Sequence, residues 1–185
     1  MNKPKGYVCS AVSDSHKTVY QLLPAELQDL VQNAKRGERL HTVGRLDCET
    51  SGLLLITNDG DFSHKLTDPQ NKIEKTYLVT LAHPVTKDDV ARYVKEVAAG
   101  VILPPEKKAP EEKSAPGKLE FTTGTVLDEN CVNCTITITE GKFHEVRRIF
   151  RALGNEVINL KRIKLGNYEL PLELKEGSYI IINKI

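Results

Sequence analysis

Apolar and polar positions along the chain predict more strands than helices. The run Leu53-Leu54-Leu55-Ile56-Thr57 is apolar up to its last residue, which is typical of a strand covered on both faces. In Lys75–Leu81 the residues alternate and β-forming types dominate, so we expect a second strand whose Tyr77 points opposite to Leu78. Shorter strands are expected at residues 7–10, 39–43, 120–127, 131–139, 156–165 and 179–182, with Asp128-Glu129-Asn130 as the turn between the third and the fourth.

Helical periodicity marks fewer segments. From Val146 to Leu153, apolar residues recur at positions i, i+3, i+4 and i+7, and Gly154 is suited to end this helix. Helices are also expected at residues 25–34, 61–66 and 86–100, with one helical turn at 18–23. Because strands outnumber helices and a hairpin favours antiparallel pairing, the sequence predicts an α+β fold with a mixed, mainly antiparallel sheet.

Length and composition fit a soluble protein. The 185 residues can form one domain or two small halves, and 39% hydrophobic residues suffice for a core. Residues 104–117 include four prolines and no large apolar side chain, so we expect a mobile surface loop there. No stretch is long and apolar enough for a membrane span, and the polar N-terminus does not fit a signal peptide, so we expect a cytoplasmic protein.

Cysteine usage does not indicate a metal site. Of the four cysteines, only Cys131 and Cys134 form a C-x-x-C pair. One such pair without a second pair or flanking histidines is a poor zinc signal, and its strand-like surroundings favour ordinary sheet positions. We therefore expect no bound metal.

A candidate for chemistry precedes the apolar strand. The sequence Gly44-Arg45-Leu46-Asp47 places a carboxylate on an irregular segment that the strand would hold at its C-terminal side. Polar loop residues held by rigid strands are a common form of active site. From these residues alone, however, a structural salt bridge or a turn-forming role for Asp47 is the more common outcome.

Positive charge is concentrated near the C-terminal end, although the whole chain carries only +1. Residues 142–164 contain seven Lys or Arg and two Glu, an excess of five positive charges that favours phosphate binding. Arg147 and Arg151 share a helix face, and Arg148 extends the basic character. The alternative is an ordinary solvated helix face, and His144 alone is more typical of a helix start than of a catalyst.

Five motifs in a fixed order make the interpretation specific. They are Gly44-Arg45-Leu46-Asp47, Thr50-x-Gly52-Leu53-Leu54-Leu55, Asn58-Asp59-Gly60, Lys75-Thr76-Tyr77 and Glu140-Gly141-x-x-His144-x-Val146-Arg147-Arg148. With them, nearly the whole chain resembles the pseudouridine synthases that modify ribosomal RNA. The opening Lys3-Pro4-x-Gly6-Tyr7-Val8-Cys9-Ser10 is most similar to the small-subunit group, which acts on uridine 516 of 16S ribosomal RNA. Large-subunit (23S) enzymes are the alternative.

The resemblance implies one catalytic domain over residues 1–185, with a mixed, mainly antiparallel sheet, flanking helices and a central active-site cleft. It implies isomerisation of uridine to pseudouridine without a metal or cofactor, with Asp47 as the nucleophile. Arg147 would keep Asp47 ionised, Tyr77 would stack on the uracil and relay a proton, and Arg45 would take the place of the extruded base.

The same motifs imply an RNA-binding role for Lys75, His144 and Arg148, and the basic helix face adds Arg151 as a residue expected to face RNA. The expected partner is ribosomal RNA or a ribosomal precursor particle, and the expected state is a monomer that does not contact a membrane.

Two features depart from the family pattern. A small RNA-binding domain usually precedes the Lys3-Pro4 motif, and the chain begins at this motif, so we expect a catalytic domain that binds RNA weakly without that domain. Residue 145 is Glu where the family usually has Gln, which places a negative charge beside Arg147 and Arg148.

Two functions of other classes fit parts of the sequence. One is a non-catalytic module that binds structured RNA, and the other is a carboxylate hydrolase that uses Asp47 and Glu49. A glycosidase needs two carboxyls about 5 to 9 Å apart across a sugar. Residues two apart in a turn rarely face each other in this way, which disfavours the hydrolase.

Overall fold

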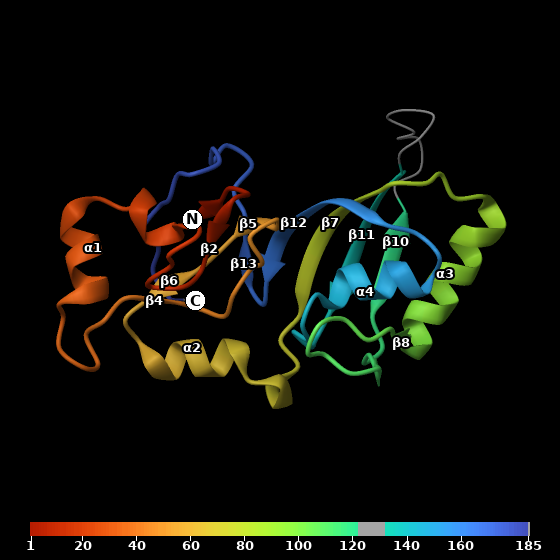
Figure 1. Cartoon of the computed structure of the whole chain (residues 1–185), viewed down its shortest axis with the longest axis horizontal. Helices are drawn as coiled ribbons and strands as arrows, with labels where there is room; N and C mark the ends of the chain where they lie inside the picture. Colours follow the sequence, from red (N-terminus) through yellow and green to blue (C-terminus); the bar gives the residue numbers. More distant parts are fainter. Residues whose placement is uncertain (122–131, 185) are drawn as a thin grey trace. The chain divides into compact units, whose positions relative to one another are not determined.

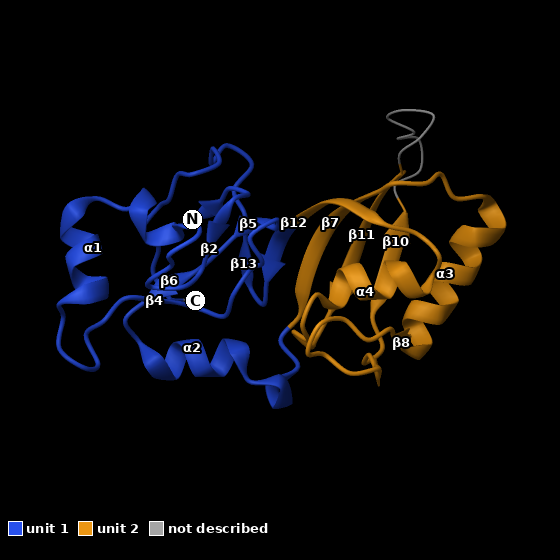
Figure 2. Ribbon diagram, in the orientation of Figure 1, with its two compact units in different colours: residues 1–73, 162–185 blue, residues 74–161 orange. Residues whose placement is uncertain are grey.

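The computed structural model describes residues 1–121 and 132–184. They form two compact units, residues 1–73 with 162–185 (unit 1) and residues 74–161 (unit 2), which Figure 2 shows in different colours. Strand β12 (Val157–Leu165) contributes its residues up to Lys161 to unit 2 and the remainder to unit 1.

Unit 1 is built from short elements (Figure 1). These are β1 (Asn2–Lys3), β2 (Tyr7–Val8), β3 (Lys17–Thr18), the 3-10 helix η1 (Val19–Leu22), α1 (Ala25–Gln32), β4 (His41–Thr42), β5 (Ser51–Leu53), β6 (Ile56–Thr57), α2 (Gly60–Thr67), η2 (Pro69–Asn71) and β13 (Tyr168–Glu169). The sheet order is β1-β5-β12, and β13 pairs with β12. Strands β2 and β3 form a parallel pair, and β4 and β6 an antiparallel one. The core of this unit contains Val43, Leu53, Leu55, Leu66, Leu165 and Tyr168.

Unit 2 contains the longest strands. Its elements are β7 (Lys75–Leu81), α3 (Lys87–Ala99), β8 (Ile102–Leu103), β9 (Glu112–Lys113), β10 (Lys118–Phe121), β11 (Val132–Ile138) and α4 (Glu145–Ala152), together with the first part of β12. The order is β12-β7-β11-β10, and both β7–β11 and β10–β11 are antiparallel. Helix α3 contacts β10, and α4 contacts β8 (Figure 1). The α+β prediction with a mainly antiparallel sheet is confirmed.

Local chemistry explains where α3 and α4 begin and end. The Thr86 hydroxyl accepts a hydrogen bond from Asp89 N, and the Asp89 carboxylate accepts one from Thr86 N, which makes a capping box. Gly100 follows α3 with φ 81°, as expected of a helix terminator. In α4 the apolar face packs inward, since Val146, Ile149 and Phe150 are buried.

The apolar run at residues 53–57 was predicted as one strand, and this is wrong. The structure divides it between β5, in the main sheet, and β6, which pairs with β4. Leu54 and Leu55 lie between these strands and are buried as predicted, and their backbones bond Met1 and Val43. Burial of the run therefore reflects its passage from the main sheet to the small β4–β6 sheet rather than one continuous ladder.

Other predicted strands have mixed outcomes. Of the strand predicted at 156–165, residues 157–165 form β12. The expected hairpin pairing is seen between β10 and β11, but most of the predicted strand 120–127 and the Asp128-Glu129-Asn130 turn lie outside the described residues. The strand predicted at 179–182 is absent from the described part of the chain. Gly177 N donates to Asn2 O and Asn2 N donates to Ser178 O, but this pairing does not continue as a ladder. Ile180, Ile181 and Ile182 are exposed.

Candidate active site

Asp47 lies where the sequence predicts it, on an irregular segment between β4 and β5. Its side chain is half-buried, while that of Arg45 is exposed. Leu46 between them is 6% exposed and anchors the segment, because its N–H donates to Cys9 Sγ at 3.4 Å. After Asp47 the chain turns, with Thr50 N donating to Asp47 O at 3.1 Å. The carboxylate is thus presented beside a fixed backbone.

The buried ammonium group of Lys3 holds this turn together. Lys3 Nζ donates to the carbonyl oxygens of Asp47 at 3.0 Å, Cys48 at 3.3 Å and Thr50 at 2.8 Å, and Lys3 is 0% exposed. Burial lowers the pKa of Lys3, and interactions with Cys9 and Cys48, then with Asp47 and Glu49, partly offset this effect. Lys3 therefore positions the turn. In the sequence it belongs to the opening Lys3-Pro4 motif, which gave no reason to predict it as a site residue.

Gly52 lets β5 approach β12 closely. Its φ is +105°, and a Cβ at this position would lie 2.2 Å from the Arg162 carbonyl oxygen, so no other residue fits. The buried Arg162 side chain donates from Nε to Leu53 O at 2.9 Å. Together these contacts fix the strand that follows the Asp47 turn.

In unit 2, Lys75 and Tyr77 lie two residues apart on β7 and therefore on one face of it. Tyr77 is 8% exposed and lies opposite Ile136 of β11, while Leu78 is 39% exposed, which confirms their predicted opposite directions. Lys75 Nζ donates to Thr139 O at 3.3 Å.

The arginines of α4 have different environments. Arg147 is half-buried and donates from NH1 to Val157 O at 3.0 Å. Its predicted pairing with Asp47 joins one residue of each unit and stays a prediction. Arg151 remains half exposed, as an RNA-binding role requires.

The prediction that Arg148 faces RNA is wrong, because Arg148 is 0% exposed. Its guanidinium donates to Pro104 O at 2.8 Å, Pro110 O at 2.6 Å and the Glu112 carboxylate at 2.8 Å. It therefore ties α4 to the proline-rich segment 104–117. This segment also contains β9, which pairs with β8, and the buried Ser114. Segment 104–117 thus makes more contacts with the rest of unit 2 than we expect of a mobile surface loop. Its mobility is not tested and stays a prediction.

Glu106 connects two of the predicted RNA-binding residues. Its carboxylate accepts from His144 Nδ1 at 2.8 Å and from Arg151 NH1 at 3.0 Å. Desolvation acts to raise the pKa of Glu106, but the bond from His144 and the charges of His144 and Arg151 outweigh it, so the pKa lies below its usual value. His144 thus lies at the start of α4, as predicted for a helix-start residue, and it also contacts the Glu106 carboxylate.

Glu145, the departure from the family pattern, is buried at the first position of α4 and is 4% exposed. Its carboxylate accepts from Lys142 N at 2.9 Å. Burial raises the pKa of Glu145 to about 7, with a further increase from Glu140 and opposing effects of the Lys142 bond and charge and of Lys75. The Glu145 carboxyl is therefore partly protonated near neutral pH, so it carries less than the full negative charge expected beside the arginines.

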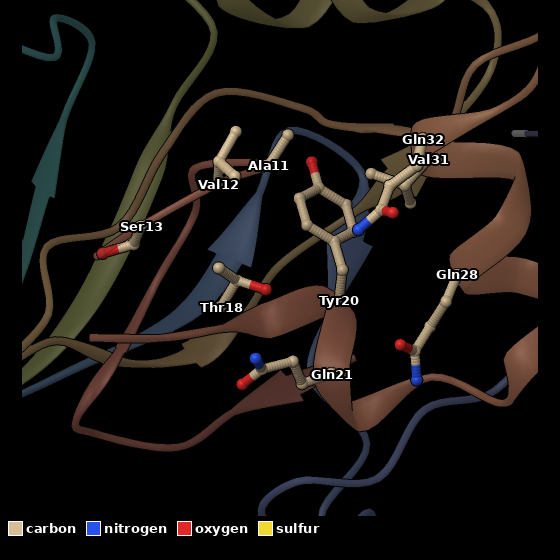
Figure 3. Close-up of a pocket in the computed structure, with 9 residues that line it drawn as sticks. All are labelled: Ala11, Val12, Ser13, Thr18, Tyr20, Gln21, Gln28, Val31 and Gln32. Carbon is tan, nitrogen blue, oxygen red and sulfur yellow. The ribbon is translucent and has the colours of Figure 1, made fainter. Parts of the chain in front are cut away.

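A separate pocket lies in unit 1 (Figure 3). It has a volume of about 180 Å³, and Tyr20, Gln21, Gln28 and Gln32 are among its lining residues. Tyr20 is anchored there, since its hydroxyl accepts from Thr42 N at 3.1 Å. None of the predicted site residues lines this pocket.

Metal-binding clusters and membrane-spanning helices are absent from the described residues. These residues contain no group of three or more His, Cys, Asp or Glu suited to a metal ion. Cys134 is a buried residue of β11, and burial raises the pKa of its thiol to about 12, while Cys131 lies outside the described residues. No described helix is long and apolar enough to cross a membrane.

Comparison with known proteins gives concordant results. Residues 1–152 match the model of a family described as RNA pseudouridylate synthase. The chain is 42% identical to the "Ribosomal small subunit pseudouridine synthase A" of Haemophilus influenzae over 97% of its own length and 67% of that protein. For the Escherichia coli protein of the same name, the identity is 39% over the same shares.

A solved structure is also similar. "Crystal structure of pseudouridylate synthase" aligns with a TM-score of 0.79 and 42% identity, and it covers 99% of this chain and 68% of that one. The chain thus spans about two thirds of the length of the relatives that it matches.

Proposed function

Because the chain belongs to the family of RNA pseudouridylate synthases, we propose that it converts uridine to pseudouridine in the small-subunit ribosomal RNA. The similarity to two small-subunit synthases supports this substrate over large-subunit RNA. The observation that carries the proposal is Asp47, a half-buried carboxylate on a turn that the buried ammonium of Lys3 holds by three backbone carbonyls.

The reaction balances as an isomerisation. The bond from ribose carbon 1 to ring nitrogen 1 breaks, and a bond from ribose carbon 1 to ring carbon 5 forms. Ring carbon 5 loses its proton to solvent, and ring nitrogen 1 gains one. A carboxylate that bonds transiently to ribose carbon 1 or ring carbon 6 divides this rearrangement into feasible steps, which is the role of Asp47.

The other catalytic roles are proposed from the family motifs. In this proposal Arg147 stabilises the ionised form of Asp47, because a positive charge near a carboxylate favours its ionised form. Tyr77 stacks on the uracil and relays a proton. Arg45 is exposed two residues before Asp47 and occupies the space of the extruded base, which offsets an extrusion cost of a few kcal/mol. The working protein is a monomer that binds ribosomal RNA or a precursor particle.

Release of tritium from RNA labelled at ring carbon 5 of uracil tests the proposal. Wild-type protein is expected to release tritium from small-subunit RNA, naked or in precursor particles, and not from large-subunit RNA. Release from large-subunit RNA alone would reassign the substrate. Absence of release from all substrates, with RNA binding retained, would favour a non-catalytic RNA-binding module.

Asp47→Asn is expected to reduce the rate by about four decades or more and to leave RNA affinity nearly unchanged. The amide preserves the shape of the side chain but cannot act as an anionic nucleophile. Glu49→Gln is the matched control, since Glu49 is exposed two residues later. Activity of Asp47→Asn within tenfold of wild type would contradict the assignment, and an equal loss of activity in Glu49→Gln would show that the effect is not specific to Asp47.

A further inference from the structure

Phe143, at the start of α4, exposes an aromatic ring in charged surroundings. Its exposed fraction is 43%, and its ring stacks on His144 with centroids 3.9 Å apart and an interplanar angle of 17°. A ring with one supported face and an exposed surface is suited to stack on a nucleobase, as aromatic side chains of RNA-binding proteins do.

The backbone beneath this ring is fixed by buried groups. Arg148 NH1 donates to Phe143 O at 3.3 Å, and the buried Glu145 carboxylate accepts from Lys142 N at 2.9 Å. His144, which supports the ring, is held by Glu106 at 2.8 Å. The ring is therefore mounted on a fixed support, so a stacking partner need not order the loop when it binds.

Backbone strain also concentrates at this place. Among the described residues, Lys72, Lys107 and His144 are the non-glycine residues with positive φ. Two of them belong here, because His144 has φ 48° and Lys107, with φ 52°, holds its Nζ 5.9 Å from the Phe143 ring centroid. Strained conformations persist where contacts over-determine them, and they cluster at ligand sites.

The charges around the ring favour a nucleic acid over an apolar protein partner. Lys107 and Lys108 are exposed, and Arg151 is half exposed on the same helix as His144. Glu106 opposes them with one carboxylate, which is 18% exposed and already bonded to His144 and Arg151. Cations beside an aromatic ring combine the phosphate attraction and base stacking that single-stranded RNA requires.

We propose that Phe143, supported by His144 and with the exposed Lys107 ammonium over its ring, is the stacking site for one unpaired base of the RNA substrate. The inference rests on the proposed function, which supplies RNA as the ligand, and it adds a residue that neither the motifs nor the comparisons assign. Its role is to bind the RNA strand, while chemistry remains with Asp47.

A tryptophan reporter can test the stacking directly, because the chain contains no Trp. Phe143→Trp is expected to show saturable quenching of its emission when a single-stranded oligouridylate of about eight nucleotides is added. The matched control is Val94→Trp on α3, where the replaced side chain is 37% exposed, and its emission is expected to stay unchanged. Equal responses of the two reporters would overturn the proposal.

Affinity gives an independent test. Binding of the same oligouridylate with a fluorescent label is expected to weaken roughly tenfold in Phe143→Ala and to stay within about twofold of wild type in Phe143→Tyr. The salt dependence is expected to be the same in all three proteins, since stacking neutralises no phosphate. An affinity of Phe143→Ala within about twofold of wild type would contradict the stacking site.

Two further measurements separate this inference from folding and from the proposed function. Circular dichroism and thermal unfolding verify that Phe143→Ala is folded, and if it is not, the tryptophan reporter decides. Tritium release by the wild type together with unaltered binding by Phe143→Ala would refute only the stacking site. Absence of tritium release together with weakened binding by Phe143→Ala would refute the enzyme and retain the RNA-binding surface.

Discussion

Lys3 illustrates, at the scale of single residues, how one buried cation can position a catalytic turn. In Lys3→Met, the carbonyl oxygens of Asp47, Cys48 and Thr50 lose a shared donor. A misplacement of about 1 Å can reduce a rate by about 100-fold, so we expect kcat to fall by about 10- to 100-fold with KM nearly unchanged. Tritium release measures both constants.

The exposed Lys5 provides the control for this experiment. Lys5→Met removes the same charge two residues later and is expected to retain wild-type kcat. If Lys3→Met kept the wild-type kcat while remaining folded, the ammonium group would have no positioning role. A fall in both variants would instead indicate that the positive charge itself contributes to RNA binding.

Glu145 predicts a pH dependence of stability. Its pKa is about 7 in the folded protein against an ordinary value of 4.5, so between these values the folded state holds a proton that the unfolded state releases. The free energy of unfolding should therefore fall by about 3 kcal/mol as the pH rises through this window, and no further above it. Glu145→Gln should remove this dependence and be more stable than wild type at pH 8.

Urea unfolding of wild type and Glu145→Gln at a series of pH values measures this effect. The exposed Glu176→Gln is the control and should keep the wild-type pH profile. Parallel profiles for wild type and Glu145→Gln would show that Glu145 does not titrate in this range. The departure from the family pattern would then have no effect on stability.

At the scale of elements, Arg148 is the link between α4 and segment 104–117. Arg148→Met is expected to destabilise the protein by about 3 to 5 kcal/mol, because it removes a fully buried guanidinium and leaves Glu112 and the carbonyl oxygens of Pro104 and Pro110 without their donor. Arg151→Met is the matched control on the same helix, and loss of its half-exposed pair with Glu106 should cost about 1 kcal/mol or less. Denaturant unfolding midpoints compare the two, and equal midpoints would contradict the structural role of Arg148.

Elements were predictable where the pattern was local. The capping residues of α3, the apolar face of α4 and the alternation of β7 depend on near neighbours in sequence, and the structure agrees with them. The division of residues 53–57 was not predictable, because it depends on pairing of β5 with β1 and of β6 with β4. The same reason applies to Arg148, whose partners at Pro104, Pro110 and Glu112 are 36 to 44 residues away in sequence.

At the scale of the whole molecule, charge counts along the sequence overestimated the number of cations that are available to bind RNA. Residues 142–164 carry five excess positive charges, but Arg148 and Arg162 are buried and bond protein groups. Lys142 pairs with Glu140, and Arg151 pairs with Glu106. The structure places Asp47 on the predicted irregular segment and Lys75 and Tyr77 on the predicted strand β7, while their catalytic and binding roles stay predictions.

The last prediction follows from this smaller set of available cations. Because Arg148 and Arg162 are buried, we expect two to three phosphate contacts. The slope of log affinity against log salt would then be about −1.4 to −2.7, since each contact adds about 0.7 to 0.9. Arg151→Gln should lower the magnitude of the slope by about one unit, and Lys95→Gln, an exposed cation of α3, should leave it unchanged. Binding of small-subunit ribosomal RNA over a salt series measures these slopes. A steeper wild-type slope with equal effects of the two substitutions would place the RNA-binding surface elsewhere, because the charge of Arg151 would then act only through its general contribution to the net charge.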